Sequence, residues 1–197
     1  MGMKILLKAF KTEIAPTKEQ RQKIICSIGV ARFLYNQYIA YNKKLYKMYQ
    51  RGLLDCHQKH FVTANDFDKY VNHNLKIALP WINDCASKAC KKSLVNAEVA
   101  FKRFFYGLSG FPKFKKKSKQ DIKLYFPKNN KSDWKIWRHK LMIPSIKQVR
   151  LKEFGYLPVN ANVINGAISY IAGKFYVSVV VDIDKKSKYN KDLKVSY

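Results

Sequence analysis

Residues 161–184, ANVINGAISYIAGKFYVSVVVDID, carry the strongest fold signal in the chain. In the second half of this stretch, apolar and polar residues alternate, which is the period-two pattern of a strand with one buried face. The tripeptide AGK at 172–174 interrupts the β-rich run and is typical of a hairpin turn. The stretch therefore predicts an antiparallel hairpin with strands at 161–171 and 175–184.

Shorter segments upstream of the hairpin have the same β character. They are aromatic or β-branched, are separated by Asn, Ser, Pro or Asp, and lie at 122–126, 134–138, 140–143 and 146–154. The N-terminal run at 4–11, KILLKAFK, also reads as a strand, which the residues from Glu13 to Pro16 end. Because one isolated strand cannot satisfy its backbone hydrogen bonds, we expect it to pair with the later strands.

A long helix is expected after the first strand. Thr17 and Gln20 have the spacing of a capping box, and apolar residues then recur every three to four positions until Gly52. The predicted buried stripe consists of Ile24, Ile25, Ile28, Ala31, Leu34, Tyr38, Leu45 and Met48.

Two further helices are expected before the pattern changes to strands. The second starts near Thr63 and ends before Pro80, and the third runs from an N-cap at Asn83 to Tyr106. This order predicts an α+β fold, in which a bundle of about three helices is inserted into a small antiparallel β-barrel. The predicted domains are the barrel at 1–12 plus 121–184, a helical lobe at 13–120 and a basic tail or linker at 185–197.

The charge indicates a polyanionic partner. The chain has 39 Lys and Arg against 13 Asp and Glu, a formal charge of +26, and the region 100–152 holds 16 of these cations but two acids. A folded chain with this charge repels itself unless a polyanion is near, and nucleic acid is the commonest candidate. An anionic membrane surface needs a basic amphipathic helix as its contact, and we expect no membrane partner.

Other protein classes are disfavoured. The sequence has no run of about 18 uncharged apolar residues that could span a membrane, and its N-terminus lacks the features of a signal peptide. Four scattered cysteines do not resemble a secreted disulfide framework, which favours a reducing cytoplasm. Cys56, His57, His60 and His73 do not have the spacing of a zinc site.

The stretch 110–117, GFPKFKKK, is the main candidate for chemistry. Bases stack on aromatic rings while ammonium groups neutralise phosphates, so phenylalanines interleaved with lysines suit nucleic acid. The alternative is a solvated basic loop whose two phenylalanines are pinned into the joint between helices and barrel. The candidate contacts to a nucleic-acid backbone are Lys113, Phe114, Lys115, Lys116, Lys117 and Lys119.

Arg32, Tyr35 and Asn36 share one face of the first helix because they are spaced i, i+3 and i+4. Two interpretations remain open. These side chains contact an RNA backbone, with Arg32 as the candidate, or they form a buried polar network that fixes the helix to the barrel.

Six short motifs, in order along the chain, resemble the OrfB/TnpB family of transposon-encoded RNA-guided DNA nucleases, which are relatives of type V CRISPR effectors. They are PTKEQ at 16–20, GVARFLYN at 29–36, WI at 81–82 with KSLVNA at 92–97, AFKRFF with GFPKFKKK at 100–117, LMIP at 141–144 and GKFYVS at 173–178. The resemblance covers roughly residues 3–184.

The resemblance implies an oligonucleotide-binding-like wedge domain carrying a helical recognition lobe. It further implies binding of a structured guide RNA made from the transposon end, of the RNA–DNA hybrid, and of a short motif flanking the target DNA. By matched position, motif reading falls on Asn65, Ser87, Lys91, Pro127, Lys128 and Asn129. Ser87, Lys91 and Pro127 depart from the expected residue types, so either the motif differs or Lys91 and Lys128 read it.

The same family has an RNase H-like (RuvC-like) nuclease domain, whose separated carboxylates hold two metal ions. Asp182 and Asp184 imitate its first motif, but no Gly follows and no downstream carboxylates match. We therefore expect no catalytic residues and no cofactor for this chain, with magnesium needed only by a nuclease domain. The expected function is binding of guide RNA and target-flanking DNA without cleavage. The alternatives are a subunit that assembles with a separate RuvC-like nuclease half, a cleavage-dead RNA-guided repressor, and a basic coating protein.

Overall fold

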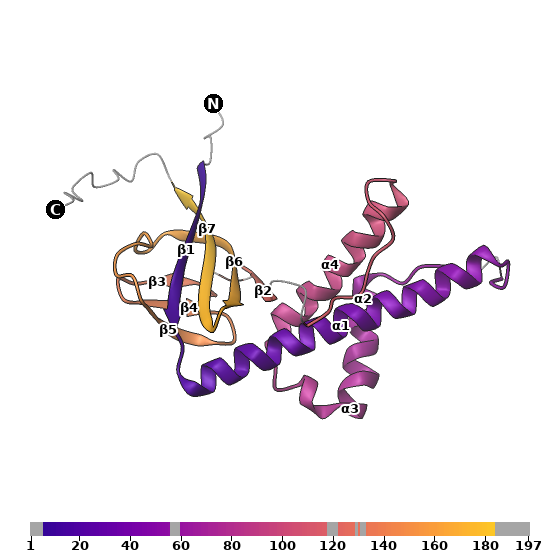
Figure 1. The fold of residues 1–197 in the computed structure, drawn as a ribbon, viewed down its shortest axis with the longest axis horizontal. Helices are drawn as coiled ribbons and strands as arrows, with labels where there is room; N and C mark the ends of the chain where they lie inside the picture. The colour runs from indigo at the N-terminus through magenta and orange to yellow at the C-terminus, as the bar shows by residue number, and fades with distance from the viewer. Residues whose placement is uncertain (1–5, 56–59, 118–121, 129, 131–132, 184–197) are drawn as a thin grey trace.

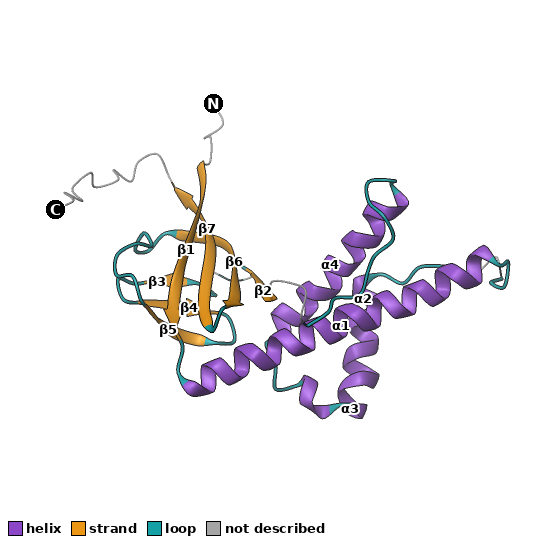
Figure 2. Ribbon diagram, in the orientation of Figure 1, coloured by secondary structure: helices purple, strands orange, loops and turns teal. Residues whose placement is uncertain are grey.

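The structure is a computed structural model, and it describes residues 6–55, 60–117, 122–128, 130 and 133–183. As predicted, the fold is α+β, with a seven-stranded antiparallel sheet at one end and the helices at the other (Figure 1 and Figure 2). The strands are β1 (Leu6–Ala15), β2 (Ile122–Pro127), β3 (Lys135–Ile136), β4 (Lys140–Ile143), β5 (Lys147–Leu151), β6 (Asn162–Ile171) and β7 (Lys174–Ile183). The helical elements are α1 (Lys18–Gln50), α2 (Ala64–Tyr70), η1 (Val71–Leu75, a π-helix), α3 (Lys76–Ala78), η2 (Pro80–Ile82, a 3₁₀-helix) and α4 (Ser87–Phe105).

The strand order is β2-β6-β7-β1-β5-β4-β3, so the N-terminal strand lies in the middle of the sheet. It pairs with β7, where Phe10 is opposite Val179, and then with β5, where Ile14 is opposite Leu151. The expected pairing of the first strand with the later ones is confirmed. The expectation that Glu13 ends this strand is wrong, because the strand continues to Ala15 while Ile14 is buried in the core.

The predicted hairpin is confirmed. β6 and β7 flank Ala172 and Gly173, which have φ angles of 48° and 79° and form the tight turn. The inward-facing valines of β7, including Val177 and Val179, are completely buried. Alternation in the sequence therefore gave the correct buried face of this strand.

The sheet is not closed into the predicted barrel. Its order ends at β2 on one side and β3 on the other, and no ladder joins these two strands within the described residues. Instead, the Trp134 side chain lies against β6: a Cβ added at Gly166 would come within 2.4 Å of Trp134 Cη2. The indole of Trp134 therefore packs on β6, and all seven strands contribute to one shared core.

The helix boundaries follow their capping signals. Thr17 and Gln20 form the predicted capping box at the start of α1, and Gly52, with φ of 65°, follows its end. The second predicted helix corresponds to α2, η1 and α3 in succession. The third begins at Ser87, later than the predicted cap at Asn83, because η2 occupies the preceding residues and Asn83 ends it.

The residues that the structure describes form two hydrophobic cores. One lies within the sheet and includes Ile24 and Ile28 from the first turns of α1, whereas the other lies among the helices and includes Leu34 and Phe101. Ile25, predicted to be in the buried stripe, is exposed instead. The domain boundaries given above remain a prediction. No helix in the described ranges is both long and apolar enough to cross a membrane.

Candidate nucleic-acid interface

The loop after α4 is held against α1 by one side chain. Asn36 Nδ2 donates to the backbone carbonyl of Lys115 (3.0 Å), and the Lys115 N–H donates to Asn36 Oδ1 (2.8 Å). The amide thereby satisfies both backbone groups of Lys115 in a segment without secondary structure. Asn36 therefore acts as a structural anchor, which fits the polar-network interpretation, but the partner is the basic loop and not the barrel.

Lys115 is half-buried, and its ammonium lies 4.1 Å from the centroid of the buried Tyr35 ring. Burial lowers the pKa of Lys115, because the charged form loses hydration, and burial raises the pKa of the Tyr35 hydroxyl. The cation–π contact partly compensates for this lost hydration. Lys115 thus differs from Lys113, Lys116 and Lys117, which are exposed to solvent.

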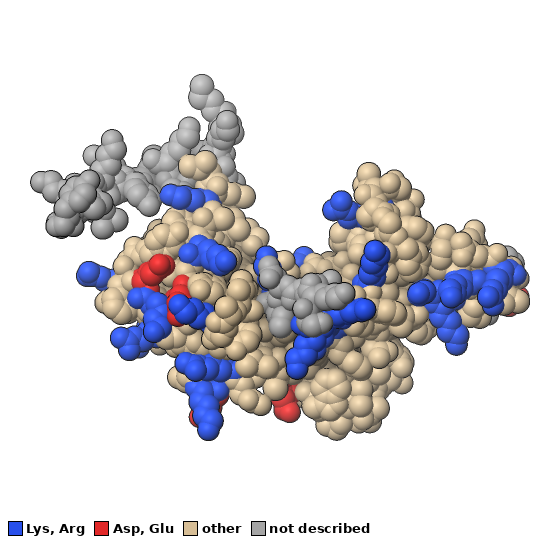
Figure 3. Space-filling model, viewed as in Figure 1, with Lys and Arg blue, Asp and Glu red and all other residues tan. Residues whose placement is uncertain are grey.

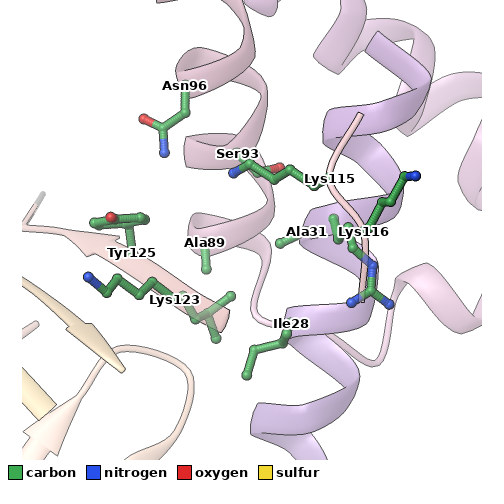
Figure 4. Close-up of a pocket in the computed structure, with 11 residues that line it drawn as sticks. Ile28, Ala31, Ala89, Ser93, Asn96, Lys115, Lys116, Lys123 and Tyr125 are labelled. Carbon is green, nitrogen blue, oxygen red and sulfur yellow. The ribbon is translucent and has the colours of Figure 1, made fainter. Parts of the chain in front are cut away.

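Four cations surround a cavity of about 300 Å³ between α1, α4 and β2. We call it the basic cavity: its polar and aromatic lining is Arg32, Lys115, Lys116, Lys123, Ser93, Asn96 and Tyr125. Figure 4 shows Ser93 and Asn96 on α4, Lys123 and Tyr125 on β2, and Ile28 and Ala31 on α1. Among the described residues, no carboxylate lines this cavity and none of its four cations is in an ion pair.

This lining suits a phosphodiester. Ammonium and guanidinium groups bind phosphate oxygens, the hydroxyl of Ser93 and the amide of Asn96 can donate further hydrogen bonds, and the part-exposed ring of Tyr125 offers a stacking surface. Figure 3 shows how few Asp and Glu side chains accompany the Lys and Arg on the viewed face.

A second cavity, of about 350 Å³, contains part of the predicted motif-reading set. We call it the lysine–aspartate cavity: Ser87, Lys91 and Pro127 line it together with Lys76, Lys88 and Asp68. Lys91 Nζ lies 3.2 Å from Asp68 Oδ2, and Lys88 Nζ lies 2.6 Å from Asp133 Oδ1. The structure thus brings three of the predicted motif residues together, with Lys91 already paired to a carboxylate.

The other predicted residues lie elsewhere. Asn65 is exposed at the start of α2 and does not line the lysine–aspartate cavity. Lys128 donates to Asn162 Oδ1 and lines a different cavity, at the open end of the sheet. Lys119, Asn129 and Asp184 lie outside the described residues.

Four polar or aromatic residues of the basic cavity were not predicted as site residues: Ser93 and Asn96 on α4, and Lys123 and Tyr125 on β2. Lys123 and Tyr125 were read only as part of a strand, although Leu124 and Phe126 between and beside them are buried. That alternation places Lys123 and Tyr125 on the opposite face, so the signal was present. What the sequence does not show is that this face of β2 meets α1 and α4.

The described residues contain no group of three or more His, Cys, Asp or Glu that could hold a metal ion. Asp182 belongs to β7, as predicted for the end of the hairpin, and lies opposite Leu7 and Asn162. Cys56 and His57, considered above for zinc, are outside the described residues.

Comparison with known proteins gives matches in sequence and in structure. The family model HTH_OrfB_IS605, described as a helix-turn-helix domain, matches residues 1–51. The Escherichia coli (strain K12) protein named "Putative RNA-guided DNA endonuclease InsQ" is 25% identical over 173 residues, which are 88% of this chain and 40% of that protein. The chain therefore spans well under half the length of this curated relative.

A solved structure described as "Cryo-EM structure of the Cas12f1-sgRNA-target DNA complex" aligns with 90% of this chain and 48% of that chain, at 13% identity and a TM-score of 0.40. This structural likeness is weak, and the similarity to a family rests on the sequence matches together with the six ordered motifs. By those matches the chain is similar to proteins of the OrfB/TnpB family.

Proposed function

We propose that this chain binds nucleic acid, with the basic cavity gripping the backbone of a structured RNA. The observation that carries the proposal is the cluster of Arg32, Lys115, Lys116 and Lys123 around one cavity that no described carboxylate lines. Because every charged residue in this lining is positive, no negative group at the cavity weakens its electrostatic attraction for a phosphate. Asn36 holds the loop that supplies two of these lysines, so part of the ordering cost is met before binding.

The RNA that fits the family is the guide made from the transposon end. The relative in Escherichia coli carries "RNA-guided" in its name, which supports an RNA partner for the region that the two proteins share. Within this proposal the chain binds the guide without cleaving nucleic acid by itself, and cleavage belongs to a nuclease half.

Target-flanking DNA is proposed to bind at the lysine–aspartate cavity. A lysine that reaches a purine edge from a fixed position reads sequence, whereas lysines on phosphates set only position. The ion pair with Asp68 gives Lys91 such a fixed position at the cavity wall. This arrangement supports base reading by Lys91 and backbone binding by the loop lysines.

The RNA proposal is tested with the double variant Lys116→Ala/Lys123→Ala. We expect affinity for a transposon-end RNA, measured by fluorescence anisotropy, to fall by about 10-fold, with a log–log salt slope shallower by about 1.5 because two phosphate contacts are lost. The matched control is Lys140→Ala/Lys152→Ala, which removes the same charge from exposed positions on the sheet.

Equal losses in the two double variants would show that only total charge matters, and would refute a site at the basic cavity. The guide assignment has its own test, because the wild-type chain should bind transposon-end RNA more tightly than unrelated RNA of equal length. Equal affinity for the two RNAs would remove the guide from the proposal.

The DNA proposal is tested with Lys91→Ala. We expect this variant to change the ranking of duplexes that differ only in the flanking motif, while the affinity for RNA stays within about two-fold of wild type, since Lys91 lies outside the basic cavity. A uniform loss on every duplex would make Lys91 a backbone contact and contradict motif reading.

A further inference from the structure

The two phenylalanines of the basic stretch have different surroundings. Phe111 packs on the helical core, with ring centroids 5.0 Å from Phe104 and 5.5 Å from Phe101. Phe114 is 46% exposed and makes no ring–ring contact with any other described residue. The interpretation that both rings are pinned into the joint therefore holds for Phe111 only, and packing does not explain where Phe114 lies.

Phe114 forms one wall of a groove along the distal half of α1. The groove has a volume of about 410 Å³, and its other lining residues are Ala40, Lys43, Lys44, Lys47, Met48, Arg51 and Leu53. Because its α1 members recur every three to four residues from Ala40 to Met48, they lie on one helix face about 12 Å long, and Arg51 follows directly after the helix. We call this surface the Phe114 groove; no Asp or Glu from the described part of the chain lines it.

The groove combines the two features of a single-strand binding site. An exposed ring offers a stacking face that any base can use, and a row of cations beside it can follow the phosphates of one strand. Lys43 Nζ lies 5.8 Å from the Phe114 ring centroid and 5.9 Å from that of Phe111, which places positive charge between the ring and the core. A peptide partner would need acidic residues to match these cations, whereas a nucleotide supplies both the ring and the negative charge.

We propose that the Phe114 groove binds an unpaired nucleotide of the bound nucleic acid, whose base stacks on Phe114 and whose flanking phosphates contact Lys44, Lys47 and Arg51. This inference rests on the proposed nucleic-acid binding and adds a second, separate site to it. The bonds from Asn36 to the next residue, Lys115, hold the backbone that carries the ring, so the stacking surface is formed before the ligand arrives.

The experiment compares an RNA hairpin that carries a short unpaired tail with the same hairpin without the tail. When both hairpins are closed by a compact tetraloop whose bases are paired or stacked on one another, Phe114→Ala should lower affinity for the tailed hairpin by about 10-fold and leave the blunt hairpin unchanged, because only the tail then supplies a free base. Phe114→Trp should restore affinity for the tailed RNA, whereas Phe114→Leu should not, since stacking needs a planar ring. 2-Aminopurine placed in the tail should be quenched on binding to wild type and to Phe114→Trp only.

Phe154→Ala is the matched control. Phe154 is 50% exposed and also has a cation nearby, with Arg150 Cζ 5.9 Å from its ring centroid, but it lies on the sheet side of the molecule. Its replacement should affect neither hairpin. A parallel series with DNA tails tests whether the groove prefers RNA or DNA. A larger loss of affinity on Phe114→Ala for one kind of tail identifies the preferred nucleic acid, and equal losses show that the groove contacts the base without distinguishing the sugar.

Failure of the inference and failure of the proposed function have different signatures. If wild type binds both hairpins and Lys116→Ala/Lys123→Ala weakens both, but Phe114→Ala matches wild type on the tailed RNA, the stacking site is refuted and the basic cavity stands. A Phe114→Leu variant with wild-type affinity likewise refutes stacking. If wild type binds neither hairpin, the proposed function itself is wrong.

Discussion

The basic cavity and the lysine–aspartate cavity both border α4 and β2, yet the lysines that line them differ in how their charge is neutralised. In the basic cavity, no described carboxylate is among the lining residues. In the lysine–aspartate cavity, Lys91 is paired with Asp68 and Lys88 with Asp133. Unneutralised cations favour any phosphate and respond strongly to salt, whereas paired cations are held in place and depend less on salt. The same residue type therefore serves two purposes, which can be separated experimentally.

The largest expected difference concerns thiols. Cys90 lines the lysine–aspartate cavity, and burial, with a smaller contribution from Cys85, raises its pKa to about 12. Because the thiolate is the reactive form, a thiol with this pKa is almost wholly protonated at about pH 8. We expect iodoacetamide to modify the exposed Cys26 at least about 100-fold faster than Cys90 in the native chain, as followed by peptide mass spectrometry.

Raising the pH should increase the Cys90 rate, because the thiolate population of a group rises steeply with pH while the pH is below the pKa of that group. Full unfolding in urea should bring the two rates close together. If Cys90 reacts as fast as Cys26 in the native state, the Cys90 side chain is accessible to solvent. The lysine–aspartate cavity is then as open to solvent at Cys90 as the protein surface is at Cys26.

Asn36→Ala tests whether the basic cavity depends on the anchored loop. The substitution leaves the N–H and C=O of Lys115 without their protein partners, so we expect a loss of about 1–2 kcal/mol in the free energy of unfolding, measured in urea. RNA affinity should fall by about 10-fold, since a mobile loop must be ordered on binding.

Gln37→Ala is the control for this change, because Gln37 is the next residue on α1 and is exposed. It should alter neither stability nor affinity. Wild-type RNA binding by Asn36→Ala would show that the loop lysines need no fixed position, and the basic cavity would then be no more than a region of high charge.

Asp68→Asn should give the smallest effect. It removes a carboxylate from the lysine–aspartate cavity and so makes its charge more like that of the basic cavity. Removing the carboxylate releases Lys91, so non-specific duplex DNA affinity should rise by about three-fold and the log–log salt slope should steepen by about 0.9, as for one added phosphate contact. Discrimination among flanking motifs should decrease at the same time. Glu153→Gln, which removes a charge from an exposed position on the sheet side, should reproduce neither result.

Local signals in the sequence predicted most of the fold. The capping box at Thr17 placed the start of α1, and the alternation in β7 placed its buried valines. The errors arose where tertiary contacts decided the outcome. Burial of Ile14 extends β1 past a polar residue, and the sheet stays open between β2 and β3, whereas a closed barrel was expected.

The candidate sites were less predictable than the fold. The lysines at 113–117 were evident from composition, but a cavity needs partners from distant elements, such as Arg32 from α1 and Lys123 from β2. The groove beside Phe114 was not predicted for a similar reason: Lys43, Lys44 and Lys47 lie on a long helix, and the sequence alone does not place them beside Phe114. Their position beside an exposed ring gives them a common role in the proposed site.

The central position of β1 has a consequence for how the chain matures during translation. This strand is synthesised before the helices, but its partners, β5 and β7, are synthesised after them. While the ribosome is still producing them, the helices between can already assemble around Leu34 and Phe101, and β1 waits with both edges unpaired. Such distant pairing slows folding and exposes a strand to association with other nascent chains, so the sheet, and not the helical bundle, should limit the yield of the folded protein.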